Sequence, residues 1–319
     1  MAVYTEVTAE DLDGFLAAYD IGEPLVFKGI AEGVENSNYY LRTTRGSYIL
    51  TLYEKRVRQD DLPYFLGLME HLAKRGLPCS TPVRGRDAEI FRVLKHRPAA
   101  VLTFLDGVSF AQPTEAHCQM AGHALAQLHQ AGADFPQQRK NALGLDGWKK
   151  LAQACAADAD TVMGGLSAII ALEIDHLSQA WPKDLPHGVI HADLFPDNVL
   201  FVENRLSGLI DFYFACNDAL SYDLAVMLNA WCFDESGAFS VAKSRALFAG
   251  YQEVRKLEPA ERTAMATLAR GAALRFLLTR LYDWLHHDPH ALVRPKDPRA
   301  FAKHLRFHRN VAGPEAYGL

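Results

Sequence analysis

The hydrophobic pattern changes character once along the chain, near Asp106-Gly107, and this change limits the folds available to it. Before this point, short segments alternate between apolar and polar residues, which is typical of half-buried strands. After it, apolar residues recur at helical spacing over much longer segments. A run of short strands followed by a run of long helices predicts an α+β fold with two separate lobes.

The first lobe is predicted to consist of an antiparallel sheet with one main helix. The expected strands are Leu25–Ile30, Asn38–Thr43, Ser47–Tyr53, Glu89–Leu94 and Ala99–Phe104. A capping signal at Thr8 begins a short helix, and an amphipathic helix is expected over Gln59–Lys74. Residues 1–105 therefore form the predicted N-terminal lobe.

Residues 106–319 are predicted to form a mostly helical second lobe, joined to the first by a short hinge at residues 105–107. The expected helices are Thr114–Gln130, Trp148–Ala159, Leu166–Trp181, Ala219–Ala230, Ser240–Val254 and Glu261–Leu285. A β-rich segment at 188–214 interrupts them. We expect the ligand site in the cleft between the lobes, because such clefts are the usual place for one.

Charge and composition exclude several classes of partner. The chain carries 33 Lys and Arg against 38 Asp and Glu, a net charge of −5, and lacks the basic footprint of a nucleic-acid-binding or membrane-surface protein. The acidic N-terminus is unlike a secretory signal, and no apolar run is long enough to span a bilayer. Five scattered cysteines suit reduced thiols. We expect a cytoplasmic protein that binds a small molecule.

The β-rich segment holds the strongest chemical signal, His191-Ala-Asp193 followed four residues later by Asn198. Two apolar strands come next and end before Asp211. A turn centred on Asn204-Arg205 would place Asn198 directly opposite Asp211, although this register could slip by a residue or two. Amide and carboxylate oxygens are the ligands that Mg²⁺ prefers. The pattern therefore predicts a magnesium site at one end of a hairpin.

Asp193 lies in the loop at the mouth of this hairpin, where it could orient a hydroxyl group. In phosphoryl transfer by protein kinases, one Asp accepts the proton of the attacking hydroxyl, while an Asn and a second Asp hold Mg²⁺. The kinase motif H-R-D-x-x-x-x-N has the same spacing, with Ala192 here in place of its Arg. The combination predicts phosphoryl transfer.

With these motifs, the chain resembles the superfamily of aminoglycoside phosphotransferases and choline kinases, which share the two-lobed fold of the protein kinases. The resemblance covers nearly the whole chain. Within the superfamily, the chain is most similar to the bacterial homoserine kinases of the kinase-like type. The segments that carry this similarity are 36–40, 48–54, 191–201, 210–214, 222–225 and 229–234.

The resemblance implies a role for each residue of the motif. Asp193 would be the catalytic base, Asn198 and Asp211 would bind Mg²⁺, His191 would brace the catalytic loop, and Asp223 would hold that loop in a structural role. On the ATP side, the residues implied are Gly33, Ser37, Asn38, Thr51, Leu102, Thr103, Phe104 and Leu105.

These ATP-side residues fall into two groups, with one departure from the family. The loop from Gly33 to Asn38 would cover the phosphates, and residues 102–105 would give the adenine its backbone hydrogen bonds. At the strand position where members of the superfamily commonly carry a lysine, this chain has Thr51. Glu70 is the candidate helix acid, with Lys28 or Lys55 as a substitute partner, and a solvated helix face is the simpler interpretation.

The resemblance also implies L-homoserine as acceptor, and its carboxylate would need a fixed arginine. Arg275 and Arg280 are the candidates, although residues five apart project about 140° apart on a helix and cannot both face one pocket squarely. Surface arginines that snorkel are an equally good interpretation. Asn229 or Asp234 could bind the ammonium group, and a helix end or loop is the alternative for each.

We therefore expect transfer of the γ-phosphate of Mg-ATP to L-homoserine, giving O-phospho-L-homoserine, a precursor of threonine. A choline- or ethanolamine-type kinase is the first alternative and would need an aromatic cage. The candidate cage residues are Trp231, Tyr213, Tyr282 and Trp284. The second alternative is a pseudokinase that binds nucleotide without turnover, suggested by the missing lysine. The oligomeric state is not predicted.

Overall fold

The structure, a computed structural model, describes residues 4–30, 36–54, 57–287 and 295–319. The chain divides into two compact units. The first contains residues 1–107 together with the returning segment 207–213, and the second contains residues 108–206 and 214–319.

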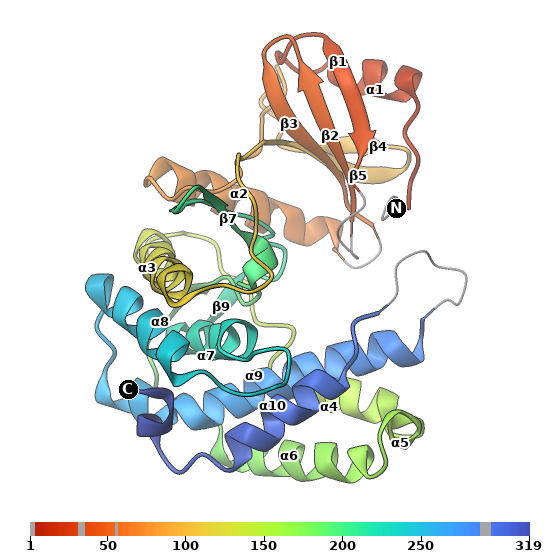
Figure 1. Ribbon diagram of the computed structural model, residues 1–319. Coiled ribbons are helices and arrows are strands. Elements are labelled where there is room, and N and C mark those ends of the chain that lie inside the picture. The colour runs from red at the N-terminus through yellow and green to blue at the C-terminus, as the bar shows by residue number, and fades with distance from the viewer. Residues whose placement is uncertain (1–3, 31–35, 55–56, 288–294) are drawn as a thin grey trace. The chain divides into compact units, whose positions relative to one another are not determined.

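The first unit is built on a five-stranded antiparallel sheet in the order β1-β2-β3-β5-β4 (Figure 1). Its strands are β1 Pro24–Gly29, β2 Ser37–Thr43, β3 Gly46–Leu52, β4 Arg92–Leu94 and β5 Arg97–Thr103. Its helices are α1 Ala9–Leu16 and α2 Leu62–Lys74, the latter preceded by a 3₁₀ turn at Gln59–Asp61.

Alternation of side chains explains how this sheet acquires its core. Alternate residues of β2 are buried, so one face of the strand packs inward. The buried cluster joins Leu41 of β2, Leu50 of β3 and Val101 of β5 to Leu12 and Phe15 of α1. The predicted cap at Thr8 is present as a capping box with Asp11.

The second unit is mostly helical. Its helices are α3 Glu115–Ala131, α4 Leu145–Cys155, α5 Ala159–Val162, α6 Leu166–Ala180, α7 Leu220–Trp231, α8 Val241–Val254, α9 Pro259–Leu285 and α10 Arg299–Arg309. Its strands β6 His187–Ile190 and β9 Cys216–Ala219 pair antiparallel. Strand β7 Val199–Val202 forms a hairpin with β8 Arg205–Leu209.

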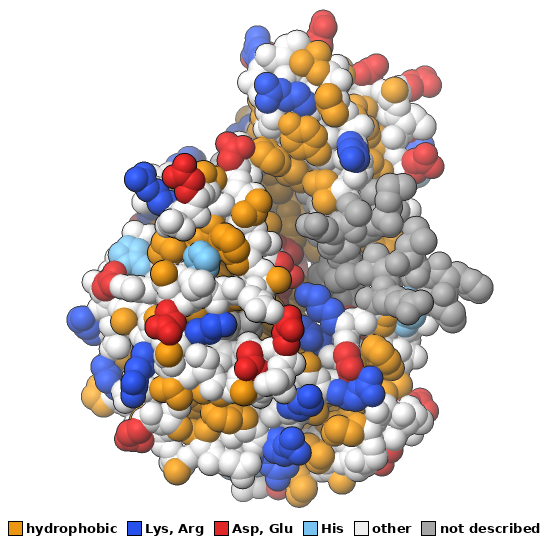
Figure 2. Space-filling model, viewed as in Figure 1, with side chains coloured by type: hydrophobic (Ala, Val, Ile, Leu, Met, Phe, Trp, Pro, Cys, Tyr) orange, Lys and Arg blue, Asp and Glu red, His pale blue; other side chains and the backbone are white. Residues whose placement is uncertain are grey.

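Helices α3 and α8 approach so closely that their backbones touch. A Cβ atom on Gly122 would lie 2.2 Å from the carbonyl oxygen of Leu247, and one on Gly250 would lie 1.9 Å from that of Gln119. Only glycine fits at either position, because the obstructing atoms belong to backbone. In the view of this unit in Figure 2, acidic and basic side chains are interspersed over the surface.

The predicted α+β fold, an antiparallel sheet followed by helices, is confirmed. Several predicted bounds are wrong. The strand predicted at Glu89–Leu94 is only Arg92–Leu94, because residues 85–88 form a turn with Ala88 at φ 69°. The helix predicted at Trp148–Ala159 ends at Cys155. The hairpin turns at Glu203 and Asn204, one position before the turn predicted at Asn204-Arg205 and within the slip allowed for it, with Glu203 at φ 54°.

Two further observations concern the environment of the chain. None of the helices in the described residues has both the length and the apolar character required to cross a bilayer. All five cysteines are free and buried, and burial raises the pKa of each thiol.

Candidate active site

The loop that follows β6 is fixed from below by Asp223, in the first turn of α7. This carboxylate is fully buried and accepts the backbone N–H of His191 and that of Ala192, both at 2.7 Å. The Nε2 atom of His129 lies 3.2 Å from the same carboxylate, and its Nδ1 lies 2.8 Å from the hydroxyl of Tyr251. Asp223 therefore satisfies the donors of a loop that would otherwise be buried without partners.

Within the loop, Asp193 and Asn198 are brought together. The carbonyl oxygen of Asp193 accepts two hydrogen bonds of 2.8 Å, one from Nδ2 of Asn198 and one from the backbone N–H of Phe195. The same Nδ2 lies 3.5 Å from the Asp193 carboxylate. Because the amide nitrogen holds the loop, the Oδ1 atom of Asn198 is left as an acceptor. Ala192 adopts φ 63°, an uncommon conformation of the kind that clusters at functional sites.

Arg275 lies beneath this loop rather than on the surface. Its side chain comes from α9, is 1% exposed, and donates a hydrogen bond to the carbonyl of Ala192. Its Nη2 atom lies 3.8 Å from Oδ1 of Asp193. The guanidinium also lies over the ring of Phe276, 4.5 Å from its centroid. The structure therefore places Arg275 under the loop that carries Asp193, whereas the sequence left it as a candidate for the acceptor carboxylate or for a snorkelling surface position.

Trp231, at the end of α7, is a second anchor of the loop. It is 1% exposed, and its Nε1 atom donates to the carbonyl of Leu194 at 2.8 Å. The sequence offered Trp231 as part of an aromatic cage, but its ring belongs to the core of the helical unit. Sequence reasoning missed this anchoring contact, because the two residues lie 37 positions apart.

Arg280 lies one helical turn beyond Phe276 and is half-buried. Its guanidinium stands over the ring of Phe301, 4.4 Å from the centroid. Burial lowers the pKa of Arg280 to about 10, against the opposing effect of the nearby carboxylates of Asp197, Asp193 and Asp297. The side chain therefore stays protonated at neutral pH and lies near the candidate base.

The two residues predicted to bind the ammonium group both serve the fold. Asn229 is buried, its Nδ2 atom donates to the carbonyls of Ala225 and Ala269 at 3.0 Å, and its Oδ1 lies 3.2 Å from His308. Asp234 closes a turn: hydrogen bonds from Ser236 and from the backbone of Ala238 lower the pKa of its carboxyl. For Asp234, the alternative prediction of a residue at a helix end or in a loop therefore describes the contacts best.

Asp211 belongs to the segment 207–213 of the first unit. This segment is fixed by the N–H of Leu209, which donates to the carbonyl of Pro78 at 2.8 Å. Asp211 follows β8 with φ 66°, a conformation uncommon for a residue other than glycine. Tyr213 lies next in this segment, with its hydroxyl 3.0 Å from that of Tyr53. Burial raises the pKa of both tyrosines, and the charge of Asp211 raises them further.

The residues predicted to contact the ATP phosphates lie along β2 and β3. Thr51 is buried and its hydroxyl donates to Oδ1 of Asn38 at 2.8 Å. The hydroxyl of Ser37 is fully engaged: it donates to Glu54 at 2.7 Å and accepts the N–H groups of Tyr4 and Thr5. Gly33 and Lys55 lie outside the described residues.

Residues 102–105, which the resemblance assigns to the adenine, include the last two residues of β5. The N–H of Thr103 donates to Thr81 at 2.8 Å and that of Phe104 donates to Ser47 at 3.3 Å, while Leu102 is paired within the sheet. No hydrogen bond of Leu105 is among these contacts, although its side chain packs beside Gly208. The role of residues 102–105 toward adenine stays a prediction.

Glu70 of α2 is not a solvated residue of the helix face. Both of its carboxylate oxygens accept hydrogen bonds from the guanidinium of Arg84, at 2.8 and 2.7 Å. The interpretation of Glu70 as a solvated residue is therefore wrong, because the partner seen among the described residues is Arg84. Of the two lysines predicted as partners, Lys55 lies outside the described residues. Sequence reasoning missed this pair, because Arg84 lies in a loop after the helix and no local pattern links it to Glu70.

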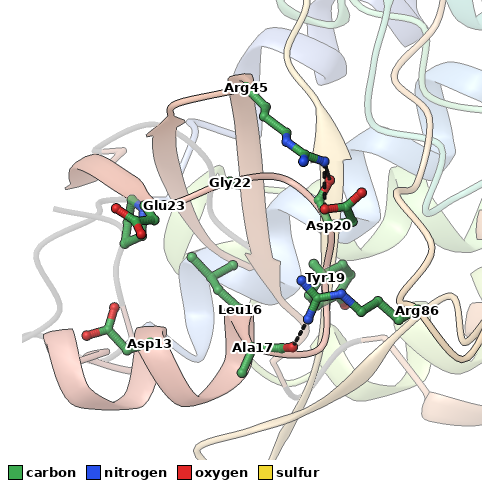
Figure 3. Close-up of a pocket in the computed structure, with 10 residues that line it drawn as sticks. Asp13, Leu16, Ala17, Tyr19, Asp20, Gly22, Glu23, Arg45 and Arg86 are labelled. Atoms are coloured by element: carbon green, nitrogen blue, oxygen red, sulfur yellow. Dashed lines mark hydrogen bonds and ion pairs between the residues drawn. The ribbon is translucent and has the colours of Figure 1, made fainter.

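A separate hollow of about 360 Å³ lies on the first unit between α1 and the start of β1 (Figure 3). Arg45 forms an ion pair with Asp20 there at 2.6 Å, and Arg86 donates to the carbonyl of Ala17 at 2.6 Å. None of the predicted site residues lines this hollow. Both of its arginines are engaged with the walls of the hollow.

The fold and the Asp193–Asn198 loop define a class of enzyme. Residues 26–257 match the family described as the phosphotransferase enzyme family. The chain belongs to this family.

Similar proteins narrow the comparison further. The chain is 59% identical over 319 residues to a homoserine kinase of Parvibaculum lavamentivorans, covering 100% of this chain and 99% of that protein. It is equally similar, at 59% identity and the same coverage, to a homoserine kinase of Rhodospirillum rubrum. Among solved structures, an amicoumacin kinase has a TM-score of 0.71 at 14% identity, covering 97% of this chain and 95% of that chain, which shows the shared fold.

Proposed function

We propose that this chain transfers the γ-phosphate of ATP to the hydroxyl of L-homoserine, giving O-phospho-L-homoserine and ADP. Full-length identity of 59% to proteins named homoserine kinase carries the proposal. The arrangement of the loop supports it, because Asp193 and Asn198 are held together at the end of a rigid, buried framework. A binder without turnover would have no need of this base.

In the proposed reaction, the hydroxyl oxygen of homoserine attacks the γ-phosphorus of ATP and the bond to the bridging oxygen of ADP breaks. Asp193 accepts the proton that the hydroxyl loses. Arg275 and Asp223 fix the backbone of the loop that carries this carboxylate. The protein therefore acts mainly by positioning, as is usual in phosphoryl transfer.

Asn198 and Asp211 are the proposed ligands of Mg²⁺. The available oxygen of the Asn198 amide and the carboxylate of Asp211 are hard donors that suit this ion. Among the described residues, no group of three or more His, Cys, Asp or Glu is placed to hold a metal ion. In phosphoryl transfer, the phosphates of ATP supply further oxygen ligands. When bound, Mg²⁺ neutralises charge that develops on the phosphates.

A choline-type acceptor is less well supported. Two of the residues offered for an aromatic cage are engaged elsewhere: Trp231 is buried and donates to Leu194, and Tyr282 stacks on His286 with ring centroids 4.1 Å apart. A quaternary ammonium site needs several aromatic faces around one point. We also expect a cytoplasmic location, since five free, buried thiols suit a reducing compartment.

An acceptor panel tests the proposal. ADP release is measured by a coupled assay with Mg-ATP and L-homoserine, choline, ethanolamine, an aminoglycoside or no acceptor. Turnover confined to L-homoserine is expected. Turnover with another acceptor would overturn the proposed substrate and keep the kinase reaction, whereas retained ATP binding without turnover would favour the pseudokinase.

A further inference from the structure

Helix α9 carries four arginines, and three of them are engaged by the fold. Arg262 donates to Gln252 at 2.7 Å, and Arg270 forms a close pair with Glu173. Arg275 donates to Ala192 under the catalytic loop. Within the described part of the chain, the guanidinium of Arg280 has no such hydrogen bond or ion pair. Arg280 is thus the uncommitted cation of this helix.

The carboxylates around Arg280 already have cations of their own. Asp193 lies 3.8 Å from Arg275, Asp197 lies 3.2 Å from Lys296, and Asp297 lies 2.9 Å from Arg299. Among the described residues, three carboxylates therefore face four cations, counting Arg280. The histidine nearby adds no charge, since burial lowers the pKa of His304 to about 3. One positive charge is left over beside the candidate base.

The guanidinium of Arg280 is held in place by aromatic rings. Arg280 stands on Phe301, whose ring centroid lies 5.3 Å from that of Phe276 and 6.4 Å from that of Phe195. Phe195 is a residue of the catalytic loop, two positions after Asp193. A planar guanidinium stacked on a ring keeps its edge available for a planar anion. The rings therefore tie the position of Arg280 to that of the loop.

We propose that Arg280 binds the carboxylate of the acceptor and so selects a hydroxylated amino acid over an amino alcohol that lacks the carboxylate. This inference rests on the proposed function and names the residue that sets its specificity. A carboxylate matches the guanidinium fork with two parallel hydrogen bonds, and the partly buried position reduces screening by water. An acceptor without a carboxylate leaves the charge of Arg280 unpaired.

The test compares L-homoserine with 3-aminopropan-1-ol, which is the same molecule without its carboxylate. Steady-state kcat/KM is measured for both acceptors with wild type, Arg280→Gln, Arg280→Met and Arg280→Lys. Methionine keeps apolar contact with Phe301, and lysine keeps the charge without the fork. Arg306→Gln, an exposed arginine on α10, is the matched control.

For Arg280→Gln and Arg280→Met we expect kcat/KM for L-homoserine to fall by about 10- to 100-fold, as for loss of a hydrogen-bonded charge pair. For 3-aminopropan-1-ol it stays within about twofold, so the preference of the wild type collapses. Arg280→Lys keeps part of the preference, and Arg306→Gln keeps all of it.

Three results would overturn the inference. An equal loss with both acceptors would mean that Arg280 supports the fold or the chemistry rather than the carboxylate. Unchanged kinetics of the variants with an active wild type would remove Arg280 from the acceptor site and leave the proposed reaction intact. A wild type that is inactive on L-homoserine would refute the proposed function, and this anchor with it.

Discussion

The guanidinium of Arg275 lies 3.8 Å from the carboxylate of Asp193, and the same side chain donates to the carbonyl of the preceding residue, Ala192. The protein-kinase motif carries an arginine within the loop, whereas here a guanidinium reaches the loop from a helix 83 positions further along the chain. Removal of either partner of a buried charge pair is costly, because it leaves the other charge buried without compensation. Arg275 and the catalytic loop therefore depend on each other.

Replacing Arg275 should impair catalysis more than nucleotide binding. We expect Arg275→Met to lower kcat about 100-fold, because small displacements of a reacting group have effects of this size. The KM for ATP should change by about twofold or less, since the polar contacts of the side chain are to the loop that carries Asp193. Arg275→Lys, which keeps the charge but loses the fork, should recover part of kcat. Steady-state kinetics would contradict this role if kcat of the methionine variant matched that of wild type.

Asp223 should be among the residues most important for stability. Asp223→Ala leaves the N–H groups of His191 and Ala192 and one nitrogen of His129 without their acceptor in a fully buried site. We expect a loss of about 3 kcal/mol in the free energy of unfolding, measured by urea denaturation. Asp234→Ala, in an exposed turn, is the control and should cost much less. Equal stability of the two variants would contradict the assignment.

Acid should destabilise the protein through His304. Its ring stacks on Phe233 at 3.7 Å between centroids, and burial lowers its pKa from 6.5 to about 3. Between these pH values the unfolded chain binds a proton that the folded chain does not, so the folded state loses stability as the pH falls. The expected slope is about 1.4 kcal/mol per pH unit within this window.

His304→Phe removes that proton and keeps a ring between Phe233 and Phe301. Urea denaturation of both proteins at several pH values between 4 and 8 would measure the difference in slope. His308, buried nearby with its pKa also lowered, should keep part of the acid sensitivity in the variant. Identical pH profiles for variant and wild type would show that His304 already takes up its proton in the folded state.

The contact between α3 and α8 gives a prediction about packing alone. Gly250→Ala forces a Cβ atom against the carbonyl of Gln119, so the two helices must separate. We expect the variant to lose about 3 kcal/mol of stability, at the upper end for overpacking because the obstruction is backbone. Gly164→Ala, with nothing within 4 Å of the added atom, should differ from wild type by about 0.5 kcal/mol or less. Similar melting temperatures for the two variants would refute the close contact.

The sequence predicted those parts of the molecule that depend on local pattern. The strands 38–43 and 47–53 and the helix 59–74 follow from periodicity, and β2, β3 and α2 lie within a few residues of these bounds. The neighbouring positions of Asp193 and Asn198 also follow from the sequence, since one short loop holds both. Such features need few contacts from distant parts of the chain.

Long-range contacts account for what the sequence did not predict. An arginine among leucines on α9 has the same sequence pattern whether its side chain reaches solvent, binds a ligand or bonds to Ala192, so the sequence leaves the role of Arg275 open. No local sequence pattern indicates that residues 207–213 belong to the first unit either. Asn229 is a residue type common in binding sites, so the sequence made it a candidate. Its hydrogen bonds to Ala269 of α9 and His308 of α10 show that it joins helices instead.

The central claim, phosphoryl transfer to L-homoserine with Asp193 as base, is tested most directly by following the product. L-Homoserine and Mg-ATP are incubated with wild type or Asp193→Asn, and phosphorus NMR monitors the appearance of a phosphate monoester. We predict stoichiometric O-phospho-L-homoserine and ADP with wild type, and a loss of at least about 1,000-fold in rate with the variant. A variant as fast as wild type, or ADP formed without the phosphate ester, would contradict the account.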